Sequence, residues 1–205
     1  KIFLPFSNSL LLQDASSRLG FSPKYTNTLA QQLKDGIADL GALITYHRSD
    51  SNKMKDEEIQ KLRNLIKENI GINYLASQKI EYKEKSKFVQ QGHEAVTPTQ
   101  LTISPEDVKN VLNNDQFKLY ELIWKRTVAS QMSQSKSLET SYFINGDQFV
   151  FKSTGSIQIF QGFKKIYNYA DKTEKTQDLP NLKKGDILKI VNVETKQNFT
   201  KPPNR

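Results

Sequence analysis

The feature that most constrains the fold is a change in the period of the apolar residues near residue 133. Before this point apolar side chains recur at three- and four-residue steps, as in residues 56–70, which predicts amphipathic helices. After it, short β-branched and aromatic runs flank turn signals such as Asn145-Gly146, which is typical of a β-hairpin. The sequence therefore predicts an α+β chain. We expect a helical domain over residues 1–134 and a β-rich domain over residues 135–205.

Cap and stop residues predict the helix ends. Ser7 or Ser9 is expected to cap a first helix that stops at Gly20, and Ser22 with Pro23 to begin a second that stops near Gly36. Further helices are expected over residues 56–70, from residue 104 onward, and from residue 115 or 116 to 132. Strands are expected over residues 138–144, 148–152, 155–163 and 187–193, and the polar stretch 78–91 is expected to be a solvated loop.

The charge of the chain favours a polyanionic partner. Its 205 residues include 30 Lys and Arg against 22 Asp and Glu, a formal net charge of +8. Nucleic acid is the first expectation and an anionic membrane surface the second. No apolar run reaches the roughly 18 residues of a membrane span, and the start lacks the shape of a signal peptide. We therefore expect a cytoplasmic protein with no membrane partner, and, because residue 1 is not Met, a piece of a longer chain.

Composition also excludes some kinds of chemistry. The sequence has no Cys, so disulfides, thiolate catalysis and Cys-bound zinc are excluded. It has only two His, His47 and His93, which are too few for a His-rich metal site.

Residues 43–51, with the sequence LITYHRSDS, place a tyrosine close to an arginine. A protonated tyrosine is a poor nucleophile, but the guanidinium of Arg48 could stabilise the phenolate of Tyr46 and also hold a phosphate. This pattern fits a tyrosine that attacks a phosphodiester. The same residues also fit a short strand over 43–46 and a turn into a helix capped by Asp50 or Ser51. On its own the run leaves both interpretations open.

Six segments in order resemble bacterial type IA DNA topoisomerases. Residues 43–51 are similar to the family's active-site segment GLITYMRTDS, and residues 12–22, LQDASSRLGFS, resemble its LQQEASxRLGF segment. Residues 90–99, QQGHEAVTPT, resemble QEAHEAIRPT. The remaining matches are residues 30–33, the predicted helix 119–132 and residues 199–203. Six ordered matches across the whole chain are not explained by chance.

The resemblance implies a fold and a reaction. In the family the tyrosine-bearing domain is helical and similar to winged-helix domains, and the β-rich part belongs to an arch. The domain boundary is expected near residues 132–137. The implied reaction relaxes negatively supercoiled DNA: one strand is cut through a 5′-phosphotyrosine link, the other strand passes, and the break is religated. Because the covalent intermediate keeps the bond energy, no ATP is needed. The implied partners are single-stranded or negatively supercoiled DNA and the remaining domains of the enzyme, at the bacterial nucleoid.

Magnesium is the implied cofactor of the complete enzyme. Family members carry an acidic Asp-x-Asp-x-Glu cluster, whereas this chain contains no Asp-x-Asp. Its acidic pairs Glu57-Glu58 and Glu106-Asp107 fit the first turns of helices. We therefore expect no metal site in these residues, and we expect the chain alone to bind single-stranded DNA weakly without relaxing supercoils.

The resemblance also implies roles for single residues. Tyr46 is the implied nucleophile, Arg48 is expected to bind the scissile phosphate, and His93 to bond the phosphate or move a proton to the leaving 3′-oxygen. Glu94 is expected either to orient His93 or to cap a turn. The residues expected to hold this group or to contact DNA are Thr45, Ser49, Asp50, Gln32 and Arg18. His47 replaces a family Met and is expected to pack or to lie at a DNA edge.

The chain departs from the family pattern near His93. Thr97 stands where the family has Arg, Gln91 where it has Glu, and Gly92 where it has Ala, so one positive charge is missing there. An alternative from another class is a non-catalytic single-stranded nucleic-acid-binding module that kept the fold. A tyrosine recombinase is disfavoured, because that chemistry needs a His-x-x-Arg motif and His93 does not begin one.

Overall fold

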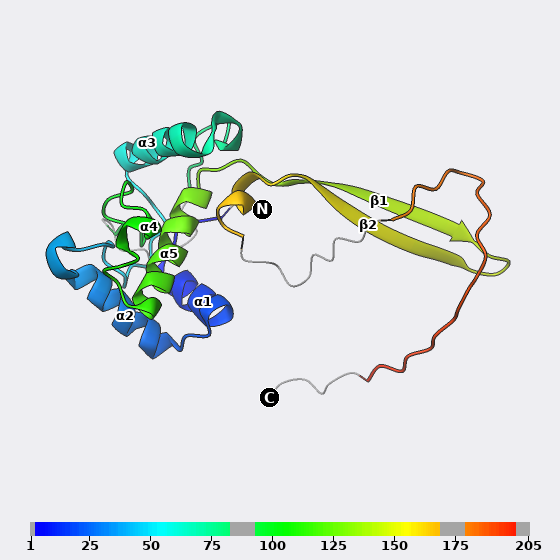
Figure 1. Ribbon diagram of the computed structural model, residues 1–205, viewed down its shortest axis with the longest axis horizontal. Coiled ribbons are helices and arrows are strands. Elements are labelled where there is room, and N and C mark those ends of the chain that lie inside the picture. The colour runs from blue at the N-terminus through cyan, green and yellow to red at the C-terminus, as the bar shows by residue number, and fades with distance from the viewer. Residues whose placement is uncertain (1–2, 83–92, 169–178, 200–205) are drawn as a thin grey trace.

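A body of packed helices carries a long, projecting β-hairpin (Figure 1). The computed structural model describes residues 3–82, 93–168 and 179–199. In these residues the α-helices are α1 Asn8–Leu19, α2 Pro23–Asp35, α3 Asp56–Leu65, α4 Pro105–Val108 and α5 Asn114–Ala129. Shorter turns are the π-turn Ile66–Ile70 and the 3-10 turns Ala38–Leu40, Ile72–Tyr74 and Gly162–Lys165. The strands β1 Lys136–Asn145 and β2 Val150–Phe160 complete the predicted α+β chain.

The helix ends follow from local chemistry, as the sequence predicts. Ser22 accepts a hydrogen bond from the backbone nitrogen of Tyr25 at 3.3 Å, which caps α2 ahead of Pro23. Gly20 ends α1 at a φ of 73°, a left-handed conformation that glycine adopts without strain. Asn113 and Gln116, a pair that the sequence analysis did not identify, form a reciprocal capping box, so α5 begins one or two residues earlier than predicted.

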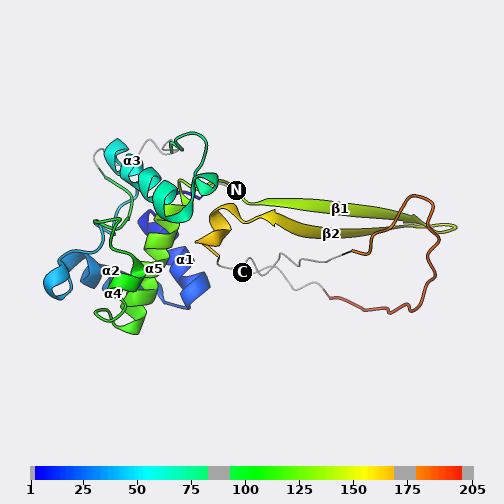
Figure 2. The same cartoon turned by 45° about the horizontal axis from the view of Figure 1, so that its top comes forward.

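Helix α5 is the centre of the helical core. Leu119, Tyr120, Leu122 and Ile123 on α5 are fully buried. The helix packs against α1, α2 and α4, which surround it in Figure 2. Because its apolar side chains cover most of its circumference, the helix is buried almost all round.

A buried arginine on α5 links the segment before α1 to the segment after the hairpin. The Nε of Arg126 on α5 donates to the backbone oxygen of Leu4 at 2.6 Å, and its Nη1 donates to the carboxylate of Asp14 at 3.2 Å. The hydroxyl of Tyr167 donates to the same carboxylate, and burial raises the pKa of this hydroxyl, which keeps it protonated. The guanidinium also lies 4.6 Å from the ring centroid of Phe3.

The chain returns to the helical core after the hairpin. Phe163 and Tyr167 are buried there, although both belong to the predicted β-rich domain. The return depends on Gly162, whose φ is 53° and where an added Cβ would lie 2.4 Å from the carbonyl of Gln134. The backbone nitrogen of Phe163 donates to the oxygen of Ser133 at 2.8 Å, which fastens the end of the hairpin to its beginning.

The hairpin itself has almost no interior. Strands β1 and β2 pair antiparallel from Lys136 with Phe160 to Asn145 with Val150. Most of their side chains are exposed or half-buried, and Gly155 is the buried position within the two strands. The sequence predicts two strands over residues 148–163, but Gly155 continues a single strand, since it pairs with Thr140 and the ladder runs through it.

Three local predictions are corrected by the structure. Residues 187–193 form no strand, because nothing described pairs with them; Ile187 and Val191 are 97% and 94% exposed. Residues 43–46 form an isolated bridge and not a strand. Neither Asp50 nor Ser51 caps a helix, since α3 begins at Asp56 with Lys55 as its cap.

Parts of two predictions lie outside the described residues. These are residues 83–91 of the predicted solvated loop and residues 200–203 of the final family match. Among the described residues, no helix is both long and apolar enough to cross a membrane.

Candidate active site around Tyr46

The Tyr46 loop is held by pairing between distant segments. Ile44 forms an antiparallel bridge with Pro98, and Phe6 forms another with Val96. Residues 95–99 therefore lie between the start of the chain and the segment that leads to Tyr46. This pairing brings residue 46 close to residues 93 and 94, although more than 40 positions separate them in the sequence.

Thr45 forms hydrogen bonds to residues 95–97 through both its backbone and its side chain. Its backbone nitrogen donates to the oxygen of Thr97 at 2.9 Å. Its hydroxyl donates to the oxygen of Ala95 at 2.8 Å and accepts from the backbone nitrogen of Thr97 at 3.0 Å. The hydroxyl thus satisfies one buried acceptor and one buried donor, which supports the expected holding role of this residue.

Asn8, a residue that the sequence analysis missed, clamps the other end of the loop. Its side-chain amide donates to the backbone oxygen of His47 at 2.9 Å, and its backbone nitrogen donates to the oxygen of Ser49 at 2.7 Å. The two bonds fix the backbone on both sides of Arg48. In the sequence Asn8 looks only like part of a helix start, and no spacing rule connects it to a loop 39 residues away.

Tyr46 and Arg48 point to solvent from this fixed loop. The Tyr46 side chain is 51% exposed and that of Arg48 is also exposed. In the described part of the chain, no residue forms a hydrogen bond or ion pair with the Tyr46 hydroxyl or the Arg48 guanidinium. Both groups are therefore available to a ligand, the hydroxyl as a nucleophile and the guanidinium as a phosphate-binding group.

His93 and Glu94 face Tyr46 across a small hollow. The hollow has a volume of about 200 Å³ and is lined by Thr45, Tyr46, Ser49, His93 and Glu94. The Nδ1 of His93 lies 3.1 Å from a carboxylate oxygen of Asp50. A carboxylate at this distance orients the imidazole ring.

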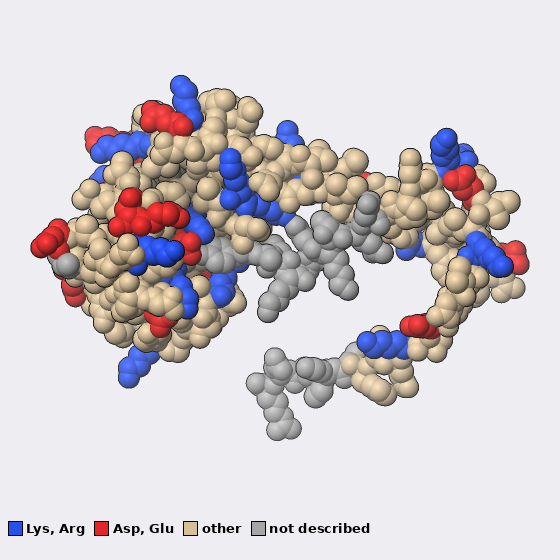
Figure 3. All heavy atoms as spheres, viewed as in Figure 1, with Lys and Arg blue, Asp and Glu red and all other residues tan. Residues whose placement is uncertain are grey.

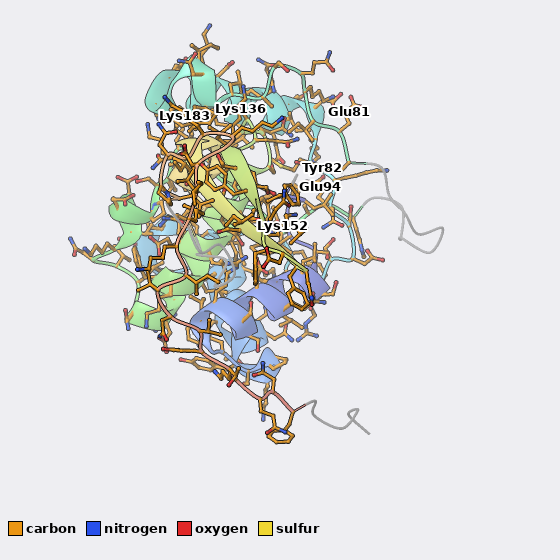
Figure 4. All side chains as sticks on the ribbon, turned by 90° about the vertical axis from the view of Figure 1, so that its right-hand side faces the viewer. Glu81, Tyr82, Glu94, Lys136, Lys152 and Lys183 are labelled. Atoms are coloured by element: carbon orange, nitrogen blue, oxygen red, sulfur yellow. The ribbon has the colours of Figure 1, made fainter. Side chains whose placement is uncertain are left out.

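Glu94 takes neither of the two roles considered for it. Its carboxylate forms an ion pair with the ammonium of Lys55 at 2.7 Å, and this hydrogen bond raises the pKa of Lys55. Figure 4 labels Glu94 and, near it in that view, Tyr82, whose hydroxyl contacts the backbone oxygens of Phe3 and Ser130. Glu94 therefore joins the site to the start of α3.

Comparison with known proteins identifies the family of this fold. A family model described as DNA topoisomerase matches residues 2–205. The chain is 41% identical to DNA topoisomerase 1 of Campylobacter jejuni and 39% identical to that of Rickettsia felis, over 98% of its length in each case. The chain belongs to the DNA topoisomerase family. It spans 29% and 27% of the lengths of these two relatives.

A solved topoisomerase has the same fold. The structure of full-length topoisomerase I from Thermotoga maritima superposes on 90% of this chain with a TM-score of 0.74 and 37% sequence identity. The match covers 29% of that longer chain. The predicted resemblance to a bacterial topoisomerase is confirmed.

His47, which stands at the position of the family Met, is buried without hydrogen-bond partners. Its ring is fully buried beside the exposed Tyr46, at 5.8 Å between ring centroids, so it packs and does not lie at a DNA edge. Neither ring nitrogen has a hydrogen-bond partner. Burial, and secondly the charge of Arg48, lower the pKa of His47, so the ring is neutral at pH 7.

Gln32 and Arg18, the two remaining predicted residues, lie at different distances from the Tyr46 loop. Gln32 lies with Arg48 along a second hollow beside α2, and its side-chain oxygen accepts from Gln116 at 3.0 Å. Arg18 lies apart from the loop, because it is ten residues, or roughly 15 Å of helix, beyond Asn8 on α1. There it forms an ion pair with Asp14 at 3.2 Å.

The described residues do not fit a magnesium site. No group of three or more carboxylate, His or Cys side chains gathers among them. Two acidic groups near the Tyr46 loop are already engaged, Asp50 with His93 and Glu94 with Lys55. Thr97, where the family has Arg, is buried and contributes its backbone to the pairing with Thr45.

Charge is dispersed over the helical body. On the face that Figure 3 shows, basic and acidic side chains are interspersed and form no large positive field. Any contact of this topoisomerase chain with DNA on this face therefore depends on local groups and not on net charge alone.

Proposed function

We propose that this chain supplies the nucleophile of a type IA DNA topoisomerase that relaxes negatively supercoiled DNA without ATP. The observation that carries the proposal is the exposed, unengaged Tyr46 hydroxyl on a clamped loop next to Arg48. The family membership supports DNA as the substrate. Because the chain spans less than a third of its relatives, the complete reaction requires the rest of the protein.

In the proposed cleavage step, the Tyr46 oxygen forms a bond to phosphorus and the bond from phosphorus to the 3′-oxygen breaks. The tyrosine loses its proton and the leaving 3′-oxygen gains one, so the step is balanced. Arg48 binds the non-bridging oxygens, where negative charge grows in the transition state. We assign the supply of this proton to His93, and its contact with Asp50 and its position in the hollow with Tyr46 support this role. Reversal of the step religates the strand, and the phosphotyrosine keeps the bond energy meanwhile.

The proposed binding site for magnesium lies in the longer protein and not in this chain. Since the described residues offer no three-ligand group, we propose that residues outside this chain bind the ion. No step of the chemistry assigned to Tyr46, Arg48 and His93 depends on a metal held by this chain.

The first prediction tests the nucleophile in the full-length protein that contains this chain. A single-stranded DNA labelled at its 3′ end is incubated with the protein, and covalent transfer of the label is measured on a denaturing gel. We expect Tyr46→Phe to abolish the labelled adduct and the relaxation of supercoils while DNA binding survives, because only the attacking oxygen is removed. Tyr142→Phe, which changes a tyrosine on the hairpin, is the matched control and should retain both activities. A labelled adduct in Tyr46→Phe would refute the proposal.

A further inference from the structure

A third hollow lies between α3 and residues 97–102. It has a volume of about 560 Å³, and small-molecule sites in proteins commonly measure roughly 300–1,000 Å³. One wall is α3 with the π-turn after it, and the other wall is residues 97–102. Tyr46, Arg48 and His93 do not line this hollow. The α3 hollow is therefore a site apart from the proposed chemistry.

Helix α3 turns a charged face toward the α3 hollow. Glu58 and Lys61 are three residues apart, Glu68 is seven residues farther on, and all three line the hollow. The other face of the helix is buried through Ile59 and Leu62, so packing fixes its rotation. Two carboxylates against one ammonium leave the lining with a surplus of one negative charge, which favours a cationic ligand.

Glu58 is the half-buried carboxylate of this lining. In the described part of the chain, no residue forms a hydrogen bond or ion pair with it, and the nearby ammonium of Lys55 is bonded to Glu94. Its place in the first turn of α3 favours the negative charge. Burial, and secondly the charge of Glu94, nonetheless raise the pKa of Glu58. A cation bound beside Glu58 would offset both effects.

Thr97 supplies a second polar group without a partner. The residue is 2% exposed, and its backbone nitrogen and oxygen both bond to Thr45. Among the described residues, none forms a hydrogen bond with the Thr97 hydroxyl. The described polar atoms that are sealed from solvent without a partner are the ring nitrogens of His47, so the Thr97 oxygen is not sealed. It opens into the α3 hollow, which Thr97 lines.

A carboxylate and a hydroxyl oxygen without partners match a guanidinium. This group is planar and always charged, and its five N–H donors can hold a carboxylate with two parallel bonds while another meets a hydroxyl. Met54, Leu65 and Leu101 are half-buried in the same lining and offer apolar surface to an alkyl stem. Thr97 stands where the family has Arg, so residue 97 brings no guanidinium of its own to the hollow.

We propose that the α3 hollow binds a small alkylguanidinium compound, of the chemical class of free arginine. The guanidinium pairs with Glu58 and donates to the Thr97 hydroxyl, and the alkyl stem lies against Leu65 and Leu101. The inference goes beyond the proposed function, because no step of the cleavage chemistry uses this hollow.

The α3 hollow shares a wall with the segment that leads to the active-site loop. The backbone nitrogen of Thr99 donates to the oxygen of Leu43 at 3.0 Å, and Thr97 bonds to Thr45 on the same segment. A ligand held by residues 97–99 binds the folded arrangement and not the locally opened one. Binding therefore stabilises the pairing that holds Tyr46.

The test compares two neighbouring glutamates in full-length, DNA-free protein. Glu58→Gln removes the proposed partner of the guanidinium. Glu57→Gln is the matched control, since Glu57 is exposed on the same turn of α3 and does not line the hollow. Affinity for ethylguanidinium is measured by saturation-transfer NMR of the ligand. We expect Glu58→Gln to weaken binding about tenfold, because a charge-assisted hydrogen-bonded pair is lost, and Glu57→Gln to leave it unchanged.

A second probe separates guanidinium recognition from attraction of any cation. Tetramethylammonium has the same charge and no N–H donor, so we expect the parent protein to bind it much more weakly than ethylguanidinium. Binding of the two cations with equal affinity would overturn the inference. Equal affinities of the Glu57→Gln and Glu58→Gln proteins for ethylguanidinium, or no binding by the parent, would overturn it as well.

Variants of residue 97 test the location from the opposite wall. Thr97→Arg places a guanidinium on the chain itself, and we expect it to abolish ethylguanidinium binding. Thr97→Val keeps the shape and removes the hydroxyl, so we expect about threefold weaker binding. Unchanged affinity in a folded Thr97→Arg protein would contradict the proposed site. If that variant does not fold, the comparison of Glu58→Gln with Glu57→Gln still decides.

Discussion

At the scale of single residues, the site contains one side chain whose polar atoms have no partners. His47 is fully buried and both ring nitrogens lack hydrogen bonds, while its neighbours Tyr46 and Arg48 are exposed. A buried polar atom without a partner costs about 1–3 kcal/mol. The unpaired ring nitrogens of His47 therefore lower the stability of the chain next to its proposed nucleophile, at a position where the family has a methionine.

We predict that His47→Met raises the free energy of unfolding by about 1 kcal/mol or more at neutral pH. Methionine has a similar size and no polar hydrogen-bonding nitrogens to desolvate. Thermal or urea unfolding of the 205-residue chain measures the change. A variant less stable than the parent would contradict this account of the buried ring.

The same residue predicts an acid dependence of stability. Burial lowers the pKa of His47 below its ordinary value of 6.5, with Arg48 and Lys34 adding to the effect and Asp35 opposing it. Below about pH 6.5 the unfolded chain therefore binds a proton that the folded chain excludes, so stability falls as the pH falls. His47→Met should remove this part of the dependence, whereas His93→Gln should retain it.

At the scale of elements, the site depends on irregular segments that are tied together by side chains. No strand holds Tyr46; isolated bridges do, and the Thr45 hydroxyl bonds to both Ala95 and Thr97. Loops positioned by a rigid helical scaffold commonly carry binding and catalytic residues. The precision of the site therefore depends on a few hydrogen bonds, and the hydroxyl of Thr45 contributes two of them.

We predict that Thr45→Val slows formation of the covalent adduct, because it leaves the nitrogen of Thr97 and the oxygen of Ala95 unpaired. Loss of about tenfold in rate corresponds to ~1.4 kcal/mol. Thr45→Ser keeps the hydroxyl and should restore most of the rate, which a role in packing alone would not predict. Single-turnover cleavage of labelled DNA by the full-length variants measures this difference.

At the scale of the whole molecule, stability is divided unevenly between body and hairpin. The helical body has a continuous core around α5. The carboxylate of Asp14 on α1 bonds to Arg126 on α5 and to Tyr167, so it holds the segment after the hairpin against this core. The hairpin projects from this body and is exposed on both faces. A two-stranded hairpin without a packed face is marginally stable in water.

We predict that amide hydrogen exchange in the 205-residue chain separates these two parts. Amides of β1 and β2 should exchange fast, through local opening, and amides in the middle of α5 slowly, through global unfolding. Mass spectrometry of peptic peptides gives both rates in one experiment. Equal protection of the amides of the hairpin and of α5 would show that further contacts stabilise the hairpin.

The helices were predictable because their signals are local. Ser22 with Pro23 and Gly20 act within one turn of chain, so their residues alone specify where α1 ends and α2 begins. Tyr46 and Arg48 were proposed from a motif. The role of Asn8 was not, because it arises from a contact across 39 residues.

The strand predicted over residues 187–193 fails for a related reason. The β-branched run has the right composition, but a strand exists only where another backbone pairs with it. In the described residues nothing pairs with that run, and its apolar side chains remain exposed. Composition therefore indicates a capacity for pairing and does not supply the partner.

The sequence by itself determined the α+β class, the family and several helix ends, and it singled out Tyr46, Arg48 and His93 as the proposed set, because these depend on local propensity and on motif. Only the tertiary structure decided that Asn8 and Thr45 clamp the loop, that Glu94 pairs with Lys55, that His47 is buried without partners and that α3 and residues 97–102 enclose a hollow. These contacts join residues far apart in sequence. Their geometry follows from packing of the whole core and not from any local pattern.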